Sequence, residues 1–251
     1  MITILLPVVL FAALIAIVYW KQDEIIQGEI DALNKSHKGL IIVGDTHVAP
    51  FENFPYISIK VDDVRIYESK EDDAAVILDV ADIYLGFDMW DIVDGNYDVQ
   101  KLVVEDGFFN IITHKDGSIN LENALATEED APEEEEPMDI HLKNIELRNL
   151  DIHKLDESSM LDVETFIYWA DGGFQTGGGE IAAHIDTEFE LNIIDDGDTT
   201  FIKHKHFEFH TDLIFNEETG FLSFKPSGIT MEHGDFELEG SLDTKNDMTI
   251  D

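Results

Sequence analysis

The sequence predicts a mainly β protein: a long, curved antiparallel sheet with one apolar face, preceded by an N-terminal transmembrane helix and a short amphipathic helix. Three observations predict this fold. The first 20 residues are apolar and uncharged, and from Leu40 onward apolar and polar residues alternate almost to the end. The alternation also slips by one residue at recurrent polar or glycine positions, which indicates bent strands.

The composition limits the possible functions of the chain. Its 251 residues include 55 acidic and 15 basic residues, giving a formal net charge of −40. Binding to nucleic acid requires clustered cations, so this class is excluded, and the acidity instead indicates a heavily solvated surface. The chain has no cysteine, which excludes disulfides, thiol catalysis and thiolate metal sites.

Residues 1–20, MITILLPVVLFAALIAIVYW, have the properties of a membrane anchor. At about 1.5 Å per residue, the uncharged run from Ile2 to Trp20 spans roughly 28 Å, close to the ~30 Å of a hydrocarbon core. Tyr19 and Trp20 follow where an aromatic belt would lie. The alternative is a cleaved signal peptide, which needs a basic start and small residues before the cut, and both are lacking. We therefore expect an uncleaved anchor.

The regions after the anchor differ in their periodicity. Ile26, Ile30 and Leu33 share one helical face, so a short membrane-proximal helix is expected. The acidic, proline-containing run ATEEDAPEEEEP interrupts the β pattern and indicates a solvated linker, preceded by a short helix capped by Ser118. The pattern ends at DTKNDMTID where a further strand begins, as in a fragment of a longer protein. The expected regions are the anchor (1–20), the membrane-proximal helix (21–39), the first β region (40–125), the acidic linker (126–137) and the continuing β region (138–251).

The slips in alternation recur in four segments. In ISIKVDDVRI the apolar positions run to Val61, slip at Asp62-Asp63 and resume at Val64. The segments LVVEDGFFNII, IELRNLDI and ITMEHGDFEL repeat this pattern. We interpret each slip as a β-bulge within one strand, which would keep the same face buried while the strand bends. A β-sandwich with two sheets covering each other fits the pattern equally well.

The histidine-rich segment IKHKHFEFH is the strongest sign of metal chemistry. His204, His206, Glu208 and His210 would share one strand face, and His-x-His is a common metal-binding spacing. Phenylalanines at the intervening positions explain the pattern as well, with aromatic residues inward and polar residues outward. We expect solvent-facing histidines, no metal and no cofactor. The chain also has no nucleophile elbow and no phosphate-binding loop, so we do not expect an enzyme.

Four short motifs follow one another in residues 1–125: the Phe54-Pro55 entry, the Asp63-Val64-x-Ile66 kink, the Val104-Glu105-x-Gly107 kink and the Asp116-Gly117-Ser118-x-Asn120 turn. In the order and spacing of these motifs, residues 1–125 resemble the amino-terminal region of the AsmA family. This resemblance implies a single-pass protein of the bacterial inner membrane, with its bulk in the periplasm. It also implies a taco-like β-groove related to bridge-like lipid transfer proteins, and a role in outer-membrane lipid homeostasis.

The functional hypothesis is that an apolar β-groove binds or transfers phospholipids for outer-membrane biogenesis. The expected partners are phospholipids and the inner membrane, not nucleic acid. The alternative is a membrane-tethered scaffold with a closed apolar face, which would assist outer-membrane protein assembly through contacts with assembly factors. The groove residues predicted from the alternation are Ile57, Ile59, Val61, Val64, Ile66, Val76, Leu78, Ile83, Leu85, Leu102, Val104, Phe109 and Ile111.

Overall fold

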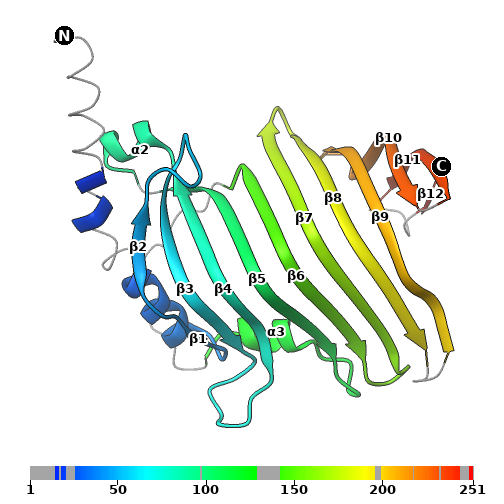
Figure 1. Cartoon of the computed structure of the whole chain (residues 1–251), viewed down its shortest axis with the longest axis horizontal. Helices are drawn as coiled ribbons and strands as arrows, with labels where there is room; N and C mark the ends of the chain where they lie inside the picture. The colour runs from blue at the N-terminus through cyan, green and yellow to red at the C-terminus, as the bar shows by residue number, and fades with distance from the viewer. Residues whose placement is uncertain are drawn as a thin grey trace.

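The computed structural model is a mainly β structure (Figure 1). It describes residues 15–16, 18–20, 26–96, 98–128, 142–195, 199–216, 218–231, 233–243 and 249–250. Most of the expected anchor over 1–20 and most of the acidic segment over 126–137 lie outside the described residues. Within the described ranges, no helix is both long enough and apolar enough to span a bilayer.

All strands of the described residues belong to one 12-stranded sheet, and no second sheet faces it. The strands pair in chain order except that β2 lies off this path and pairs with β3. Their bounds are β1 Leu40–Ile42, β2 Thr46–Ala49, β3 Ile57–Tyr67, β4 Val76–Phe87, β5 Val99–Thr113, β6 Asn144–Asp156, β7 Leu161–Gly177, β8 Glu180–Asp195, β9 Thr199–Asn216, β10 Phe221–Met231, β11 Gly234–Asp243 and β12 Thr249–Ile250.

The sheet is mixed, which corrects the expectation of a purely antiparallel sheet. Strands β5 and β6 pair in parallel, with Lys101 opposite Asn144 and Thr113 opposite Asp156. The long connection between these strands returns the chain to the end of the sheet at which β5 begins, so β6 runs in the same direction as β5. This pair joins the β regions on the two sides of the acidic segment into one sheet.

The slips in the alternation within β3, β5 and β6 are not β-bulges, because no extra residue is inserted into one strand of a pair. Asp63, Asp106 and Asn149 have positive φ angles of 49°, 57° and 51°. They lie in β3, β5 and β6 at the same level of the sheet, and pairing resumes on both sides of this level without a register shift. Neighbouring strands therefore kink together, and the same face of the sheet stays apolar above and below the kink.

The fourth predicted kink, in ITMEHGDFEL, is not within a strand. Met231 ends β10 and pairs with Gly234, the first residue of β11. The polar residues between them therefore connect two antiparallel strands as a hairpin. The prediction of a single bent strand is wrong here. A two-residue hairpin connection shifts the apolar positions by one residue, just as a slip within one strand does, so the sequence does not distinguish them.

Two short helices follow strands on the N-terminal half of the sheet. Helix α2 (Met89–Asp94) begins after Asp88, whose side chain accepts a hydrogen bond from the Trp90 amide, and ends at Gly95 in the left-handed conformation. Helix α3 (Asn120–Leu125) lacks a side-chain cap, so the prediction that Ser118 caps it is wrong. The Ser118 hydroxyl instead donates to the Asp116 carboxylate at 2.7 Å.

Asn120 connects α3 to strand β5. Its side chain is fully buried, donates to the Asn110 carbonyl at 2.9 Å and accepts from the Ile112 amide at 3.0 Å. Asn110 and Ile112 lie beyond Phe109, which is the last residue of β5 that pairs with β4. The Asn120 amide therefore satisfies backbone groups that a neighbouring strand would otherwise bond, which fixes the position of α3 at this end of the sheet.

Candidate functional site

Apolar side chains of successive strands line up in rows on one face of the sheet, which we call the apolar face. Cross-strand neighbours on the same face are close enough to pack against each other. In one such pair, the rings of Phe189 and Phe207 stack with centroids 5.2 Å apart. The row that contains them runs from β3 to β10 and consists of Val64, Val80, Gly107, Leu150, Ile167, Phe189, Phe207 and Met231.

The groove residues predicted from the sequence occupy the β3–β5 part of the apolar face. Ile57, Ile59, Val61, Val64 and Val104 are buried in one hydrophobic cluster. Four further predicted residues are partly buried and pack against this cluster: Leu78, Ile83, Leu85 and Leu102. The remaining four are partly exposed in strands β3, β4 and β5: Ile66, Val76, Phe109 and Ile111.

Helical segments cover this part of the apolar face. The helix over residues 26–36 contributes Ile26 and Ile30 to the same cluster, and α2 contributes Ile92. Ile57 and Ile59 consequently have no exposed surface, whereas Leu33 of the helix is 42% exposed. The β3–β5 part of the apolar face is thus hydrophobic core, packed beneath the helices.

Over β8 and β9 the apolar face is less buried than over β3–β5. Of the described apolar side chains on these two strands, only Phe189 packs against the cluster beneath the helices. Thr211, directly opposite Ile185, is buried against Ser227 of β10. Ile185, Phe189, Phe207 and Phe209 alternate with polar residues on these strands and are all partly exposed. The alternation in HFEFHTDLIF predicts the apolar face of this region but does not distinguish an exposed face from a covered one.

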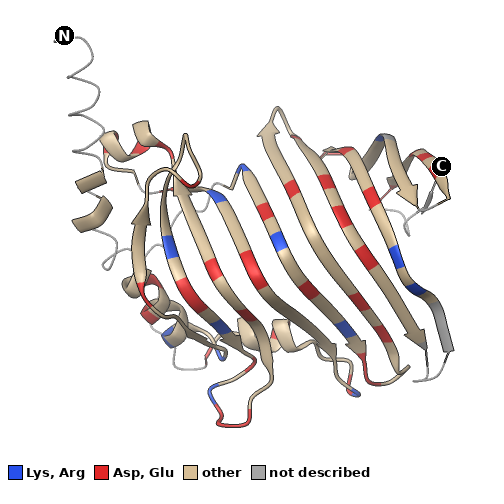
Figure 2. Cartoon of the chain, viewed as in Figure 1, with Lys and Arg blue, Asp and Glu red and all other residues tan. Residues whose placement is uncertain are grey.

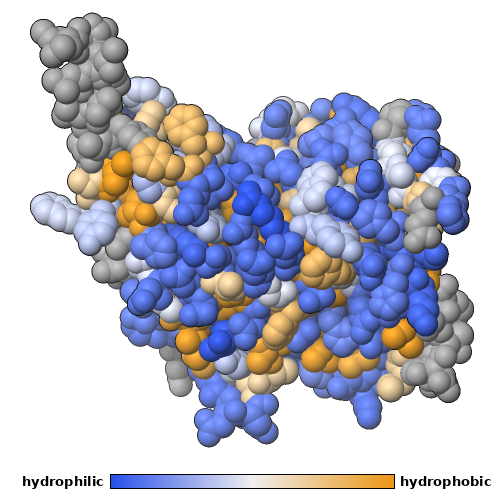
Figure 3. All heavy atoms as spheres, in the orientation of Figure 1, coloured by the Kyte–Doolittle hydropathy of each residue, from blue (hydrophilic) through white to orange (hydrophobic). Residues whose placement is uncertain are grey.

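The opposite face of the sheet is polar and is turned to the viewer in Figures 2 and 3. Figure 3 shows it as mostly hydrophilic, and Figure 2 shows the acidic and basic residues distributed along its strands. Lys60 bridges Asp82 at 2.8 Å and Asp62 at 3.1 Å, and the hydrogen bond with Asp82 is the main reason why the pKa of Lys60 is raised. The two faces of the sheet therefore differ sharply in polarity.

The histidines of β9 lie on this polar face, opposite the phenylalanines, as the alternation predicts. Each is within ion-pair distance of a carboxylate on β8: His204 of Glu190 at 2.8 Å, and His206 of Glu188 at 3.3 Å. His210 likewise contacts the carboxylate of Asp186. These histidines are partly or largely exposed, so each pair lies at the surface of the sheet.

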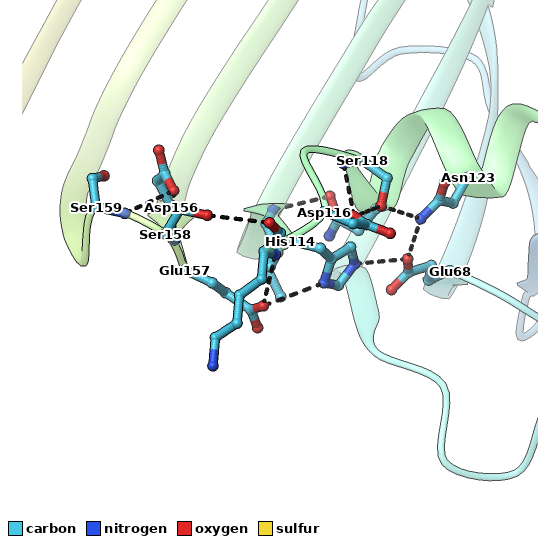
Figure 4. Close-up of polar contacts among 12 residues, drawn as sticks. Glu68, His114, Asp116, Ser118, Asn123, Asp156, Glu157, Ser158 and Ser159 are labelled. Atoms are coloured by element: carbon cyan, nitrogen blue, oxygen red, sulfur yellow. Dashed lines mark hydrogen bonds and ion pairs between the residues drawn. The ribbon is translucent and has the colours of Figure 1, made fainter.

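A polar cluster at one end of the sheet holds several loops together (Figure 4). The Nε2 atom of His114, which follows β5, lies 2.9 Å from a carboxylate oxygen of Glu68, which follows β3. The same oxygen accepts a hydrogen bond from the Asn123 side chain of α3 at 2.7 Å, and Glu157 lies 3.8 Å from the His114 ring. The hydrogen bond with Glu68 raises the pKa of His114. This arrangement is a structural junction that joins the ends of β3 and β5 to α3.

Comparisons with known proteins give no match: no protein-family model and no curated protein matches the chain.

Proposed function

We propose that this protein is a membrane-anchored lipid-binding protein whose open apolar face binds phospholipid acyl chains. Residues 1–20 would anchor it in the bacterial inner membrane, and the sheet would lie in the periplasm as a curved groove that transfers lipids for outer-membrane biogenesis. The observation that supports this function is the apolar face itself, which is buried beneath helices over β3–β5 but carries partly exposed apolar side chains on β8 and β9.

The energetics of acyl-chain binding fit such a surface. Each methylene removed from water contributes about 0.8 kcal/mol, so a chain lying on the face needs no catalytic residue and no strong polar contact. Neighbouring strands lie about 4.8 Å apart, so the span from β7 to β10 offers on the order of 14 Å of surface across the strands. Headgroups would remain in solvent at the edge of the face.

The structure changes which residues are the best candidates for lipid contact. Ile57, Ile59 and Val61 are already packed against protein, and a lipid could reach them only if the covering helices moved. We propose that contact is made by the partly exposed side chains of the same face on β8 and β9: Ile185, Phe189, Phe207 and Phe209. The partly exposed predicted residues Phe109 and Ile111 would extend this surface toward β5.

Site-specific photo-crosslinking tests the proposal. A photoreactive amino acid is placed at Phe209, on the apolar face, or at its neighbour Glu208, on the polar face, in the full-length protein in cells. Lipid adducts are then identified by mass spectrometry. We expect phospholipid adducts at position 209 and few at position 208. Equal labelling at both positions, or protein adducts instead of lipid at 209, would contradict lipid binding; the latter would favour a scaffold.

A further inference from the structure

A cluster of two histidines and two aspartates lies on the polar face where β8 and β9 pair. His184 of β8 is directly opposite Asp212 of β9, and Asp186 of β8 is directly opposite His210 of β9. Because each pair is two residues from the other along its strand, all four side chains project from the same face. The cluster therefore consists of two adjacent cross-strand pairs. In one pair the histidine is on β8 and the aspartate on β9, and in the other pair the arrangement is reversed.

The side chains of the cluster converge. The Nδ1 atom of His184 lies 2.9 Å from Asp212 Oδ1, and the two imidazole rings have centroids 5.1 Å apart. His184, His210 and Asp212 each offer one ligand atom, and these three atoms all lie within 4.8 Å of one another. In a tetrahedral site with bonds of about 2.0–2.1 Å the ligand atoms are roughly 3.3 Å apart, so small side-chain rotations would suffice to bind an ion.

Asp186 supplies a feature typical of histidine metal sites. Its Oδ2 atom lies 2.7 Å from Nε2 of His184, the ring nitrogen that does not face Asp212, and its other oxygen contacts His210. In metal sites a ligating imidazole commonly donates its second N–H to a carboxylate, which fixes the tautomer and the orientation of the ring. Asp186 is placed to do this for His184, so that Nδ1, which is paired with Asp212 in the metal-free structure, is the nitrogen that would face a metal.

The surroundings leave the cluster accessible and favour a cation. His184 and Asp212 line a surface hollow of about 520 Å³ that also includes Asp171 and Lys225. This hollow leaves room for a water or another small ligand in a remaining coordination position. Two ionised carboxylates would balance a divalent charge, and the strongly negative net charge of the chain attracts cations to the surface.

We propose that His184, His210 and Asp212 bind a divalent transition-metal ion of the Zn²⁺ class, with Asp186 as the positioning residue. Two imidazoles and one carboxylate are ligands that Zn²⁺ and Co²⁺ accept, whereas Ca²⁺ and Mg²⁺ prefer oxygen ligands alone. This site is separate from the apolar face and does not depend on lipid binding. It was not expected from the sequence, because the histidine spacing on β9 gives no sign of the His184 and Asp186 partners on β8.

The test is a metal titration of the full-length protein, purified without a histidine tag and stripped with a chelator. Zn²⁺ binding is measured by calorimetry, and Co²⁺ binding by its visible absorption. The variants are His184→Gln, His210→Gln and Asp212→Asn. His206→Gln is the matched control, because His206 is on the same strand face and also pairs with a carboxylate, but shares no ligand group with a second imidazole among the described residues. Circular dichroism of each metal-free variant verifies folding.

We expect the wild-type protein and His206→Gln to bind Zn²⁺ equally, and each of the three site variants to weaken this binding at least tenfold. The Co²⁺ spectrum should be lost in the same variants, and excess Ca²⁺ should not displace Zn²⁺. The proposal is overturned if the site variants bind like the wild type, if His206→Gln weakens binding as much as they do, or if Ca²⁺ competes effectively. The last two results would indicate general attraction of cations to an acidic surface.

Discussion

Gly107 of β5 packs directly against the backbone of Asp79 in β4. A Cβ atom at Gly107 would lie 2.1 Å from the Asp79 carbonyl oxygen and 2.6 Å from the Cα atom of Val80. Neither neighbour is the end of a flexible side chain, so only the absence of a side chain permits this approach. Gly107 directly follows Asp106, whose φ of 57° forms the kink in this strand, so close strand contact and the kink occur together.

Gly107→Ala should therefore destabilise the protein strongly. Overpacking of a well-packed site typically costs 1–3 kcal/mol, and a clash with backbone on a neighbouring strand places the expected loss at the upper end, about 3 kcal/mol. The matched control is Gly228→Ala in β10, where an added Cβ meets nothing within 4 Å. Chemical denaturation of both variants measures the difference. Similar stabilities of the two variants would show that the strands can separate at Gly107 without cost.

The kink at Asp63 gives a second prediction. Its φ of 49° is in the left-handed region, where aspartate and asparagine are tolerated but a β-branched residue is not. Asp63→Asn should leave the free energy of unfolding nearly unchanged, whereas Asp63→Val should lower it by about 1–2 kcal/mol. If both variants lose the same amount, the charge of Asp63 matters more than its backbone conformation.

Two buried serines should respond in opposite ways to the same substitution. The Ser58 hydroxyl is buried and has no hydrogen-bond partner among the described residues, whereas the hydroxyl of buried Ser227 lies 2.6 Å from that of Thr211. Ser58→Ala removes an unsatisfied polar group and should be neutral or stabilising by up to about 1 kcal/mol. Ser227→Ala leaves Thr211 without this partner and should destabilise by about 1–3 kcal/mol. Thermal melts of the two variants should therefore shift in different directions, and equal destabilisation of both would contradict this account of Ser58.

The junction between His114 and Glu68 predicts a pH dependence of stability. Because the folded-state pKa of His114 is raised above its usual 6.5, protonated His114 stabilises the folded protein. This contribution is fully present below the unfolded pKa and is lost as the pH rises through the folded pKa. The free energy of unfolding of His114→Gln should thus fall further below that of the wild type at pH 6 than at pH 8.5.

Glu68→Gln serves as the control for this measurement, because it removes the carboxylate but keeps the histidine. In a Glu68→Gln background, the effect of His114→Gln should depend only weakly on pH. A pH-dependent loss that persists without the Glu68 carboxylate would mean that another group, such as Glu157 at 3.8 Å, accounts for the shift.

The sequence predicts those parts of the fold that affect the spacing of apolar residues along the chain. The slips at Asp63 and Asn149 are visible because the apolar positions change phase there, and the phase change marks the kinks correctly. The direction of β6 has no such effect, since a long connection permits either a parallel or an antiparallel return. Likewise, the amphipathic spacing of Ile26 and Ile30 predicts a helix with an apolar face but not the surface that this face covers.

The same limitation applies to the candidate site. Alternation identifies the apolar face along β3 and β5, but burial depends on elements that pack from outside the strand. Ile59 and Phe209 have similar sequence contexts, yet Ile59 is fully buried and Phe209 is partly exposed. The metal-binding proposal depends in the same way on register, since only strand pairing brings His184 next to Asp212.

A pair of charge substitutions tests whether the apolar face is divided into a covered part and an open part. Val104 is 8% exposed and belongs to the covered cluster, whereas Ile185 is partly exposed on the same face. In Val104→Asp the carboxylate would be buried without a partner, which costs several kcal/mol, comparable with the total stability of a domain. In Ile185→Asp the carboxylate can remain hydrated. Ile185 is used for the comparison because Val103, the neighbour of Val104 on the opposite face, is itself fully buried.

We expect Val104→Asp to be insoluble or unfolded, and Ile185→Asp to keep a cooperative thermal transition measured by circular dichroism. Under the proposed function, Ile185→Asp should also reduce lipid crosslinking at position 209, because a charge on the open face raises the cost of placing an acyl chain there. Unfolding of both variants would mean that the face over β8 is covered as well, and the proposal of an open lipid-binding surface would lose its physical basis. A folded Ile185→Asp with undiminished lipid crosslinking would confirm the open face but place the acyl chains elsewhere on it.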